Sequence, residues 1–226
     1  MHNLEEWRTM NGRENFPHLS ALSIIKCPKL VELPIIPSII SFYSSRNNVM
    51  LISSVMDLTS LSSLQIEFMD ELTILLDGLL QNHKMLESFK ISNLPNLKPL
   101  TNQLNYLSAL KQFHLSCCYE LESLLEELQN LRSLQVLDIM CCENLLSFLM
   151  NGLRGLSSLR SLRIQSCKIF CSFSEGIQYL TTLQGLLIHR CLELISFPEG
   201  IQHLTALHSL QIMFCKGLSS LPKHIG

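Results

Sequence analysis

The sequence has little charge, few aromatic residues and no long apolar run. Charged residues make up 16% and aromatic residues 7% of its 226 positions. The formal net charge of -2 gives no electrostatic basis for binding nucleic acid or a membrane surface. No stretch approaches the roughly 18 apolar residues of a membrane-spanning helix. Because 47% of the residues are hydrophobic, the chain is still apolar enough to bury a large core.

Motifs for catalysis and targeting are missing as well. The sequence has no GxxxxGK[ST] or GxGxxG phosphate loop, and no HExxH or GxSxG motif. Its first residues, MHNLEEWRTMNGREN, contain no apolar segment typical of a secretory signal. Asn-x-Ser/Thr glycosylation acceptors are absent too. We expect a chain without enzyme activity, cofactor or metal, located in the cytosol or the nucleus.

A short apolar pattern, Leu-x-x-Leu-x-Leu/Ile, recurs at a nearly constant interval. It appears as LSALSIIKC from Leu19, LSSLQIEFM from Leu61 and LHSLQIMFC from Leu207. From Leu61 onward the copies are 25, 24, 24, 25, 24 and 24 residues apart, starting at Leu61, Leu86, Leu110, Leu134, Leu159, Leu183 and Leu207. This interval is typical of leucine-rich repeats.

The repeat predicts an α/β leucine-rich repeat solenoid shaped like a horseshoe. The alternating apolar residues predict a short strand with one face inward, and strands of successive repeats pair in parallel on the concave side. Apolar pairs spaced by three, such as Phe170 and Phe173, suit irregular, 3₁₀ or short helical segments on the convex side. We expect an entry segment over 1–18, part of an incomplete repeat, and a repeat domain over 19–226.

The repeat domain is expected to hold about nine units of 24–25 residues. Residues 35–60 are predicted to form one degenerate unit, with Ile36, Ile39 and Phe42 as its apolar positions and Asn47 or Asn48 near its turn. The sequence stops in mid-repeat without a clear C-terminal cap. We therefore expect apolar end surfaces, as in a piece of a longer protein.

Six of the nine cysteines share one position, three residues after the last inward residue of each strand: Cys27, Cys118, Cys142, Cys167, Cys191 and Cys215. Leucine-rich repeats place Asn or Cys there, and Cys tolerates burial while offering a weak donor. Disulfides and a metal cluster are the alternatives. Parallel side chains give poor disulfide geometry, and a column spreads metal ligands apart. We expect free structural thiols.

The eight histidines have no carboxylate partners at a regular spacing. We expect them, His83 included, to be solvated surface residues. His114 and His189 fall at outward strand positions, and His203 falls in the convex return path.

The outward strand positions differ from repeat to repeat while the inward positions do not. Residues 117–143 hold six acids and one base, whereas residues 144–226 hold seven bases and three acids. We expect Arg160, Arg163 and Arg190 to cluster on the concave face, and arginine and aromatic residues are typical interface anchors. We expect a concave ligand-binding surface, with an ordinary solvated face as the alternative, formed by Arg160, Arg163, Gln165, His189, Arg190, Gln211, Met213 and Phe214.

The last repeats carry a finer signature. IHRCLELISFPEGIQHLTALHSLQIMFCKGLSSLPKHIG contains Cys-x-x-Leu-x-x-Phe/Leu-Pro, then Gly-Ile or His-Ile and Leu-Thr-x-Leu, and FPHLSALSIIKCPKLVELP has the same cadence. Over about residues 16–226, and more weakly between Ile35 and Leu61, this resembles the C-terminal repeat region of plant nucleotide-binding disease-resistance proteins, especially the coiled-coil class.

The resemblance implies a protein-binding role in plant defence. The family senses pathogen effectors or guarded host proteins, and its repeats contribute to autoinhibition by contacting the receptor's own nucleotide-binding domain. That domain and the N-terminal signalling domain are not in this sequence.

Two other classes remain as alternatives. A substrate-receptor module of a ubiquitin ligase would need an F-box-like helical segment, and none precedes Leu19. A membrane receptor kinase ectodomain would show Asn in the turn column, a Gly-x-Ile-Pro cadence, glycosylation acceptors and a signal peptide, none of which is present.

Overall fold

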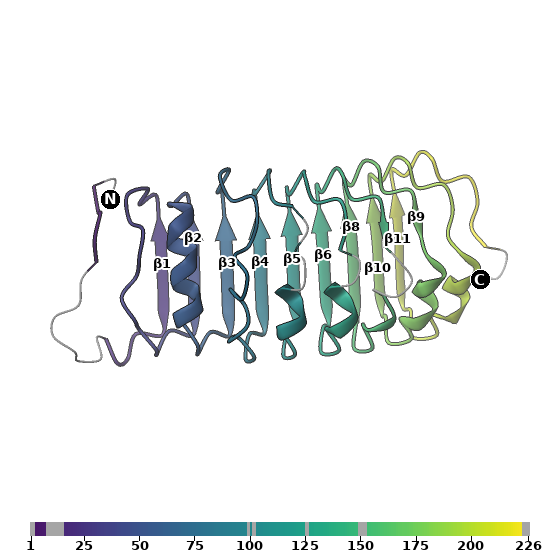
Figure 1. The fold of residues 1–226 in the computed structure, drawn as a ribbon. Helices are drawn as coiled ribbons and strands as arrows, with labels where there is room; N and C mark the ends of the chain where they lie inside the picture. The colour runs from purple at the N-terminus through teal and green to yellow at the C-terminus, as the bar shows by residue number, and fades with distance from the viewer. Residues whose placement is uncertain are drawn as a thin grey trace.

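Nine five-residue strands pair in parallel in chain order and form one sheet (Figure 1). The computed structural model describes residues 3–7, 16–98, 100, 103–124, 127–148 and 153–222. The strands are β1 (Ala21–Ile25), β2 (Ser41–Ser45), β3 (Ser63–Glu67), β4 (Ser88–Ser92), β5 (Gln112–Ser116), β6 (Val136–Met140), β8 (Ser161–Gln165), β10 (Gly185–His189) and β11 (Ser209–Met213).

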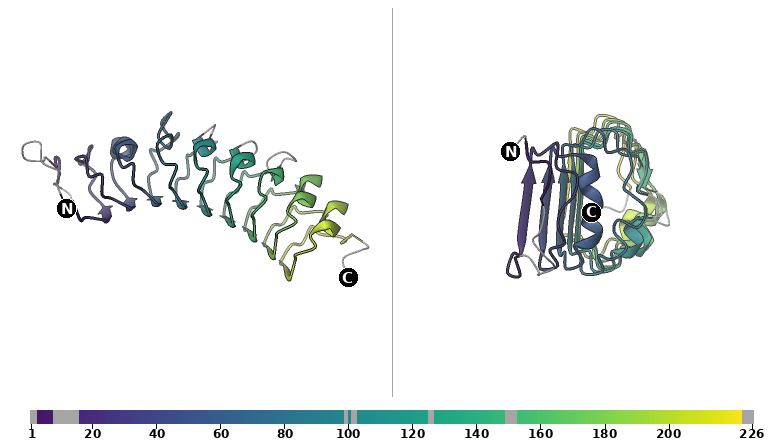
Figure 2. Two further views of the ribbon diagram at one scale, coloured as in Figure 1. Left: turned by 90° about the horizontal axis from the view of Figure 1, so that it is seen from below. Right: turned by 60° about the vertical axis from the view of Figure 1, so that its left-hand side comes forward.

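The sheet lines the inner side of a curved solenoid, and the return segments lie along the outer side (Figure 2). Strand positions two and four point into the core: in β8, Leu162 and Ile164 are fully buried. Positions one, three and five face the concave side because successive side chains alternate across a strand. The predicted leucine-rich repeat solenoid with a concave parallel sheet is confirmed.

Short 3₁₀ segments and a minor sheet form the convex side (Figures 1 and 2). The 3₁₀ segments are η1 (Val49–Asp57), η2 (Gln103–Tyr106), η3 (Glu127–Asn130), η4 (Glu175–Tyr179) and η5 (Glu199–His203). Two-residue strands, β7 (Ser147–Phe148) and β9 (Ser172–Phe173), pair in parallel. Phe173 also stacks on Phe197 of the next repeat, with ring centroids 5.4 Å apart.

Residues 35–60 contain a strand of the main sheet. β2 pairs with β1 and β3, and Ile36, Ile39 and Phe42 are fully buried. The Asn47 side chain accepts a hydrogen bond from the Cys27 backbone N–H (2.8 Å) and donates to the Ile24 carbonyl (2.7 Å). Asn47 therefore satisfies backbone groups at the turn, in the position that cysteine fills in other repeats. The division into an entry segment and a repeat domain stays a prediction.

The residue that follows each strand of the main sheet adopts a left-handed backbone conformation, with φ between 53° and 56°. These residues are Lys26, Arg46, Phe68, Asn93, Cys117, Cys141, Ser166, Arg190 and Phe214. Left-handed residues other than Gly, Asn and Asp cost roughly 1–2 kcal/mol each. The next strand offsets part of this cost, since the Arg190 N–H donates to the Met213 carbonyl (2.9 Å). Apolar periodicity does not reveal this turn.

Both ends of the described sheet leave apolar side chains partly uncovered. At β11, Leu210 and Ile212 are half-buried, and Leu221 is 45% exposed. A hollow of ≈ 680 Å³ lies against β1, lined in part by Leu4 and Trp7. The strand at each end has a neighbour on one side only, and Leu22 of β1 is half-buried like Leu210 and Ile212, although Ile24 of β1 is buried. Residues 223–226 lie outside the described part of the chain.

Replacing Leu162 by aspartate tests the inward register. The substitution buries an unpaired charge beneath the centre of β8, and we expect it to lower the free energy of unfolding by about 4 kcal/mol or more. Gln165→Asp, which alters an outward position of the same strand, is the matched control and should stay within about 1 kcal/mol of the parent chain. Urea unfolding measures both variants. Equal midpoints for Leu162→Asp and the parent would mean that the register is wrong.

Candidate functional site

Three rows of outward side chains cross β8, β10 and β11 at the C-terminal part of the concave face. The first row is Ser161, Gly185 and Ser209, the second is Arg163, Leu187 and Gln211, and the third is Gln165, His189 and Met213. The parallel register places the members of each row on neighbouring strands. Seven of the eight predicted ligand-binding residues, all but Arg160, fall in the last two rows or directly after them.

A small hollow opens over the first two rows. It has a volume of ≈ 230 Å³ and is lined by the outward residues Ser161, Arg163, Gly185, Leu187, Ser209 and Gln211, together with Leu162 and Leu186. Gly185 creates the space, because a Cβ atom built there would meet no other atom within 4 Å. Sequence reasoning named Arg163 and Gln211 but missed Gly185. Its only signal is that serine occupies this strand position in most other repeats.

A second group of predicted residues meets where β10 and β11 end. The His189 ring packs edge-on against the Phe214 ring (centroids 5.5 Å apart), and the Arg190 guanidinium carbon lies 5.9 Å from the centre of the same ring. Phe214 is 67% exposed and Met213 is 39% exposed. We name His189, Arg190, Met213 and Phe214 the exit cluster. It joins a cation to exposed apolar surface, a combination common at protein interfaces.

The three predicted arginines do not share one spot. Arg160 directly precedes β8, Arg163 is its central residue, and Arg190 directly follows β10. In the register of β8 and β10, Arg190 lies beside Ser166, which is six residues after Arg160. At about 3.3 Å per residue, the two arginines are roughly 20 Å apart along the strand direction. Only Arg163 borders the hollow. The arginines therefore span the width of the sheet, where the sequence suggested one cluster.

One carboxylate in the N-terminal half of the concave face is neutralised by neighbouring side chains. The Glu67 carboxylate accepts from Lys90 (2.9 Å), Gln65 (2.7 Å) and the Tyr43 hydroxyl (3.1 Å). Burial by itself would raise the pKa of Glu67, but these hydrogen bonds outweigh burial and hold the pKa below its ordinary value. The charge of Glu67 is therefore compensated by its own neighbours.

The C-terminal half of the concave face carries three arginines without a carboxylate partner among the described residues. Asp138 lies opposite Arg163 in the register of β6 and β8, but its carboxylate sits 3.6 Å from His114. Within the described part of the chain, no carboxylate oxygen lies within 4 Å of the Arg160, Arg163 or Arg190 guanidinium. Of the acids counted between 117 and 143, Glu126 and the side chain of Glu127 lie outside the described residues.

Five of the six cysteines of the column are buried, Cys215 is half-buried, and all six thiols are free. Cys118, Cys142, Cys167 and Cys191 have no exposed surface. Each thiol of the column donates to the carbonyl two residues earlier, as from Cys167 to Gln165 (3.5 Å). Burial raises the pKa of Cys167, and it raises the pKa of Cys191 to about 11. Cys167 and Cys191 fill the turn and are poor nucleophiles at neutral pH, whereas hydrogen bonding with Cys118 lowers the pKa of Cys142.

One histidine expected at the surface is in the core. His83 is fully buried and stands three residues before Leu86, where other repeats place a leucine such as Leu107 or Leu131. Neither ring nitrogen makes a well-formed hydrogen bond within the described residues. Burial lowers the pKa of His83, partly opposed by the backbone carbonyls of Val55 and Leu79. The prediction for His83 is wrong, because the repeat register places its side chain inward at a leucine position.

The described residues contain no group of three or more His, Cys, Asp or Glu side chains that could hold a metal ion. They also contain no helix long and apolar enough to cross a membrane.

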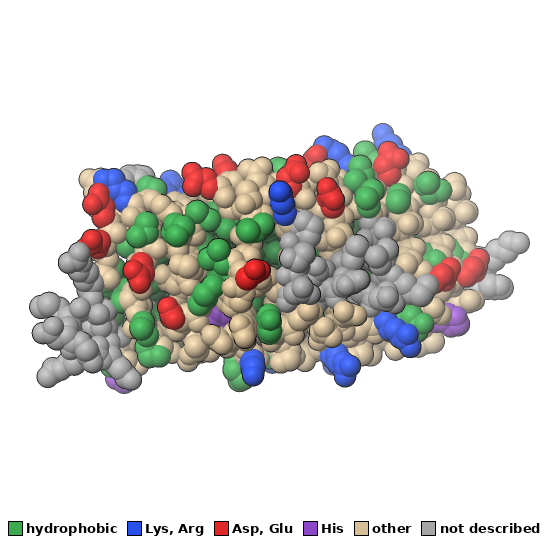
Figure 3. Space-filling model, in the orientation of Figure 1, with side chains coloured by type: hydrophobic (Ala, Val, Ile, Leu, Met, Phe, Trp, Pro, Cys, Tyr) green, Lys and Arg blue, Asp and Glu red, His purple; other side chains and the backbone are tan. Residues whose placement is uncertain are grey.

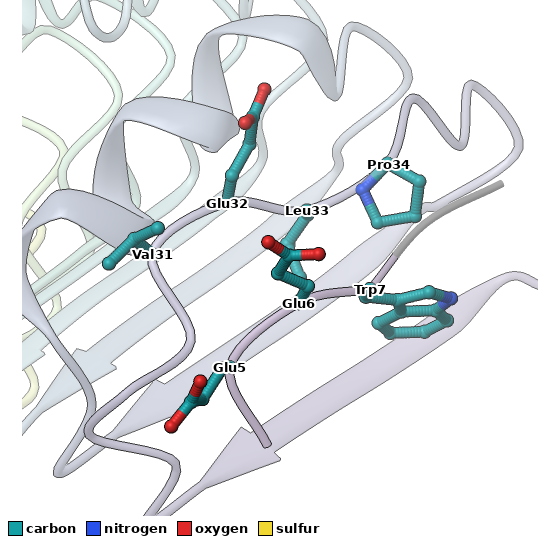
Figure 4. A pocket seen from close by; sticks show the side chains of 7 residues that line it. All are labelled: Glu5, Glu6, Trp7, Val31, Glu32, Leu33 and Pro34. Atoms are coloured by element: carbon teal, nitrogen blue, oxygen red, sulfur yellow. The ribbon is translucent and has the colours of Figure 1, made fainter. Parts of the chain in front are cut away.

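The convex and N-terminal surfaces also hold exposed or hollowed regions. Figure 3 shows apolar side chains scattered over the outer face, and those exposed in the return segments include Val31, Ile35 and Ile74. A hollow of ≈ 500 Å³ lies beside the entry segment, between Glu5, Glu6 and Trp7 and the loop 31–34 (Figure 4). Glu5 is already paired with Lys29 (2.7 Å). These surfaces rest on irregular segments, so they hold side chains less firmly than the sheet does.

The comparisons with known proteins identify the fold. No family model and no curated protein matches the chain. The leucine-rich repeat domain of the type III effector XopL matches with a TM-score of 0.72 and 23% identity, over 87% of this chain and 69% of that one. A leucine-rich repeat protein of Leptospira interrogans matches with a TM-score of 0.59 and 17% identity, over 80% and 52%. A chain of the Toll–Spatzle complex from Drosophila matches with 0.53 and 17%, over 70% and 21%.

By fold, then, the chain is a leucine-rich repeat solenoid. At these identities the likeness extends to the architecture and no further, because unrelated functions share this scaffold.

The cysteine column makes a labelling prediction. At pH 8 in the folded chain, Cys118, Cys142, Cys167 and Cys191 should react with iodoacetamide far more slowly than the partly exposed Cys171, because their side chains are fully buried. In denaturant, all nine should react at similar rates. Mass spectrometry of the digested protein measures each site. Labelling of Cys167 as fast as Cys171 would contradict the buried column, and fewer than nine labels after denaturation without reductant would reveal disulfides.

Replacing His83 by leucine should stabilise the chain and remove an acid sensitivity. The leucine fills a leucine position and removes two unsatisfied polar atoms, a gain of roughly 1–3 kcal/mol. The unfolded chain binds a proton at His83 near the ordinary pKa of 6.5, and the folded chain does so only at lower pH. The folded chain is therefore most stable, as far as His83 contributes, above that pKa. Its free energy of unfolding falls as the pH drops below it.

Urea unfolding of the parent and of His83→Leu between pH 7.5 and 5 tests this. The difference in unfolding free energy between the two chains should widen toward pH 5. A difference that is constant with pH would show that His83 is protonated equally in both states. His203→Leu, at an exposed histidine of η5, is the matched control and should leave the pH dependence unchanged.

Proposed function

We propose that the chain is a protein-binding recognition module whose contact surface is the concave face of β8, β10 and β11. The exit cluster is the observation that carries the proposal. It presents Phe214 and Met213 to solvent beside the guanidinium of Arg190. Exposed aromatic and arginine side chains dominate the energetics of many protein interfaces.

The scaffold suits this role physically. The outward positions stand on paired strands whose inward residues are fully buried, so the side chains are held on a rigid platform. Their identity does not affect the core, which lets the surface vary from repeat to repeat. The Toll–Spatzle complex, which contains the same fold, is an assembly of proteins.

We further propose that the setting is plant defence inside the cell. The support is the Cys-x-x-Leu-x-x-Phe/Leu-Pro cadence, which resembles plant nucleotide-binding disease-resistance proteins. On this proposal the partner is a pathogen effector or a guarded host protein in the cytosol or nucleus. In a full-length receptor the same repeats would also contact its own nucleotide-binding domain.

Selection of binding peptides tests the proposed surface without a known partner. The immobilised chain is used to select from a displayed library of random peptides, and hydrogen exchange then maps where selected peptides bind. We expect protection at β8, β10 and β11. Protection confined to the convex return segments, such as 31–36 and 70–78, would contradict the concave site. A screen of effector and host proteins from infected plant tissue tests the plant setting separately.

Reversing two charges of the surface should weaken acidic ligands. Arg163→Glu combined with Arg190→Glu removes two cations that lack a carboxylate partner, and we expect selected acidic peptides to lose affinity by about tenfold or more. Isothermal titration calorimetry measures this. Lys29→Glu with Lys111→Glu changes net charge equally at cations already paired with Glu5 and Glu87, and serves as the control. Unchanged affinity for the first double variant would remove these arginines from the site.

A further inference from the structure

We propose that the hollow over Gly185 receives a side-chain carboxylate, from an aspartate or glutamate of the partner protein, with Arg163 as its counter-ion. The inference rests on the proposed protein-binding function and names the chemistry of the group that is bound. Two features coincide at one place on the concave face: a hollow, and a cation without a carboxylate partner in the described part of the chain.

The space is built into the sheet. Ser161, Gly185 and Ser209 are adjacent in the register and form a floor of small residues. Arg163, Leu187 and Gln211 stand beside this floor as a wall. With a volume of ≈ 230 Å³, the hollow has room for a single side chain.

The lining has the chemistry of a carboxylate site. The Arg163 guanidinium offers a fork of N–H donors that matches a carboxylate in two parallel hydrogen bonds. The Ser161 and Ser209 hydroxyls and the Gln211 amide add neutral donors, and the Gln211 amide already reaches Ser209 (3.4 Å). No acid lines the hollow. An anion placed here therefore meets donors on two sides and no like charge among the lining residues.

Asp138 is the carboxylate that could compete from within the chain. It faces Arg163 across the β6–β8 pairing, but it lies 3.6 Å from His114 and beyond 4 Å from the guanidinium. Arg163 lines the hollow on the other side of β8, toward β10. Arg163 is therefore not paired with Asp138, and its side chain borders the hollow over Gly185.

Gly185 also supplies the means of a clean test. Its backbone has an ordinary negative-φ or extended conformation, and an added Cβ meets no atom within 4 Å. Gly185→Leu should therefore fill the hollow without unfolding the chain. Ser88→Leu adds the same side chain at the first position of β4, four strands away, and is the matched control.

The experiment follows the Arg163 side-chain N–H resonance in the full chain during titration. The probe is N-acetyl-glutamate N-methylamide, with the uncharged glutamine analogue as its comparison. We expect a saturable shift with glutamate, an affinity at least about tenfold above that for glutamine, and loss of the shift in Gly185→Leu but not in Ser88→Leu. Arg163→Lys identifies the resonance, because the signal is lost when the guanidinium is replaced.

Several outcomes would overturn the proposal. Equal responses to glutamate and glutamine would mean that the hollow does not select an anion. A shift that persists in Gly185→Leu would place the anion elsewhere. A resonance that responds to Asp138→Asn and ignores glutamate would show that the guanidinium is held internally. Selected peptides that protect β8, β10 and β11 without needing an acidic residue would support the protein-binding function. They would contradict only the binding of a carboxylate in the hollow over Gly185.

Discussion

The solenoid depends on covering the apolar side chains at strand positions two and four of every repeat. A single unit, one strand and one return segment, has too little structure to cover them by itself. Parallel pairing solves this by stacking equivalent residues, so that Leu162 lies between Leu137 of β6 and Leu186 of β10. The same constraint explains the ends of the sheet, where residues equivalent to these are only half-buried. It also makes each repeat sensitive to a change at one inward position.

The covering requirement leaves the outward positions free. Because strand positions one, three and five do not contact the core, they can carry charge, aromatic rings or no side chain at all without loss of packing. The chain uses this freedom unevenly. Around Glu67 the concave face is occupied by hydrogen bonds among its own side chains. From β8 to β11 it presents a hollow, a cation without a carboxylate partner and an exposed phenylalanine.

Some residues destabilise the repeat, and the packing of the other residues offsets their cost. The left-handed residue after each strand is strained when it is as bulky as Phe214, yet it directs the chain out of the sheet and sets Phe214 at the rim beside Arg190. His83 replaces a leucine and leaves two ring nitrogens without good partners. Leucines on both sides of it in the stack, such as Leu58 and Leu107, maintain the packing. Stability from many equivalent contacts tolerates a few poor ones.

The sequence by itself determined the fold and which residues lie on the concave face. A period of 24–25 residues with inward leucines admits one arrangement, because only stacked parallel strands bury that pattern. It also assigned the cysteine column and the outward rows that contain Arg163 and His189. It placed His83 wrongly and merged three arginines into one cluster. The tertiary structure decided which outward residues meet, because distances across strands depend on register and on the level of each residue along its strand. The hollow over Gly185 belongs to this second kind: it exists only because the flanking strands place Ser161 and Ser209 beside a residue with no side chain.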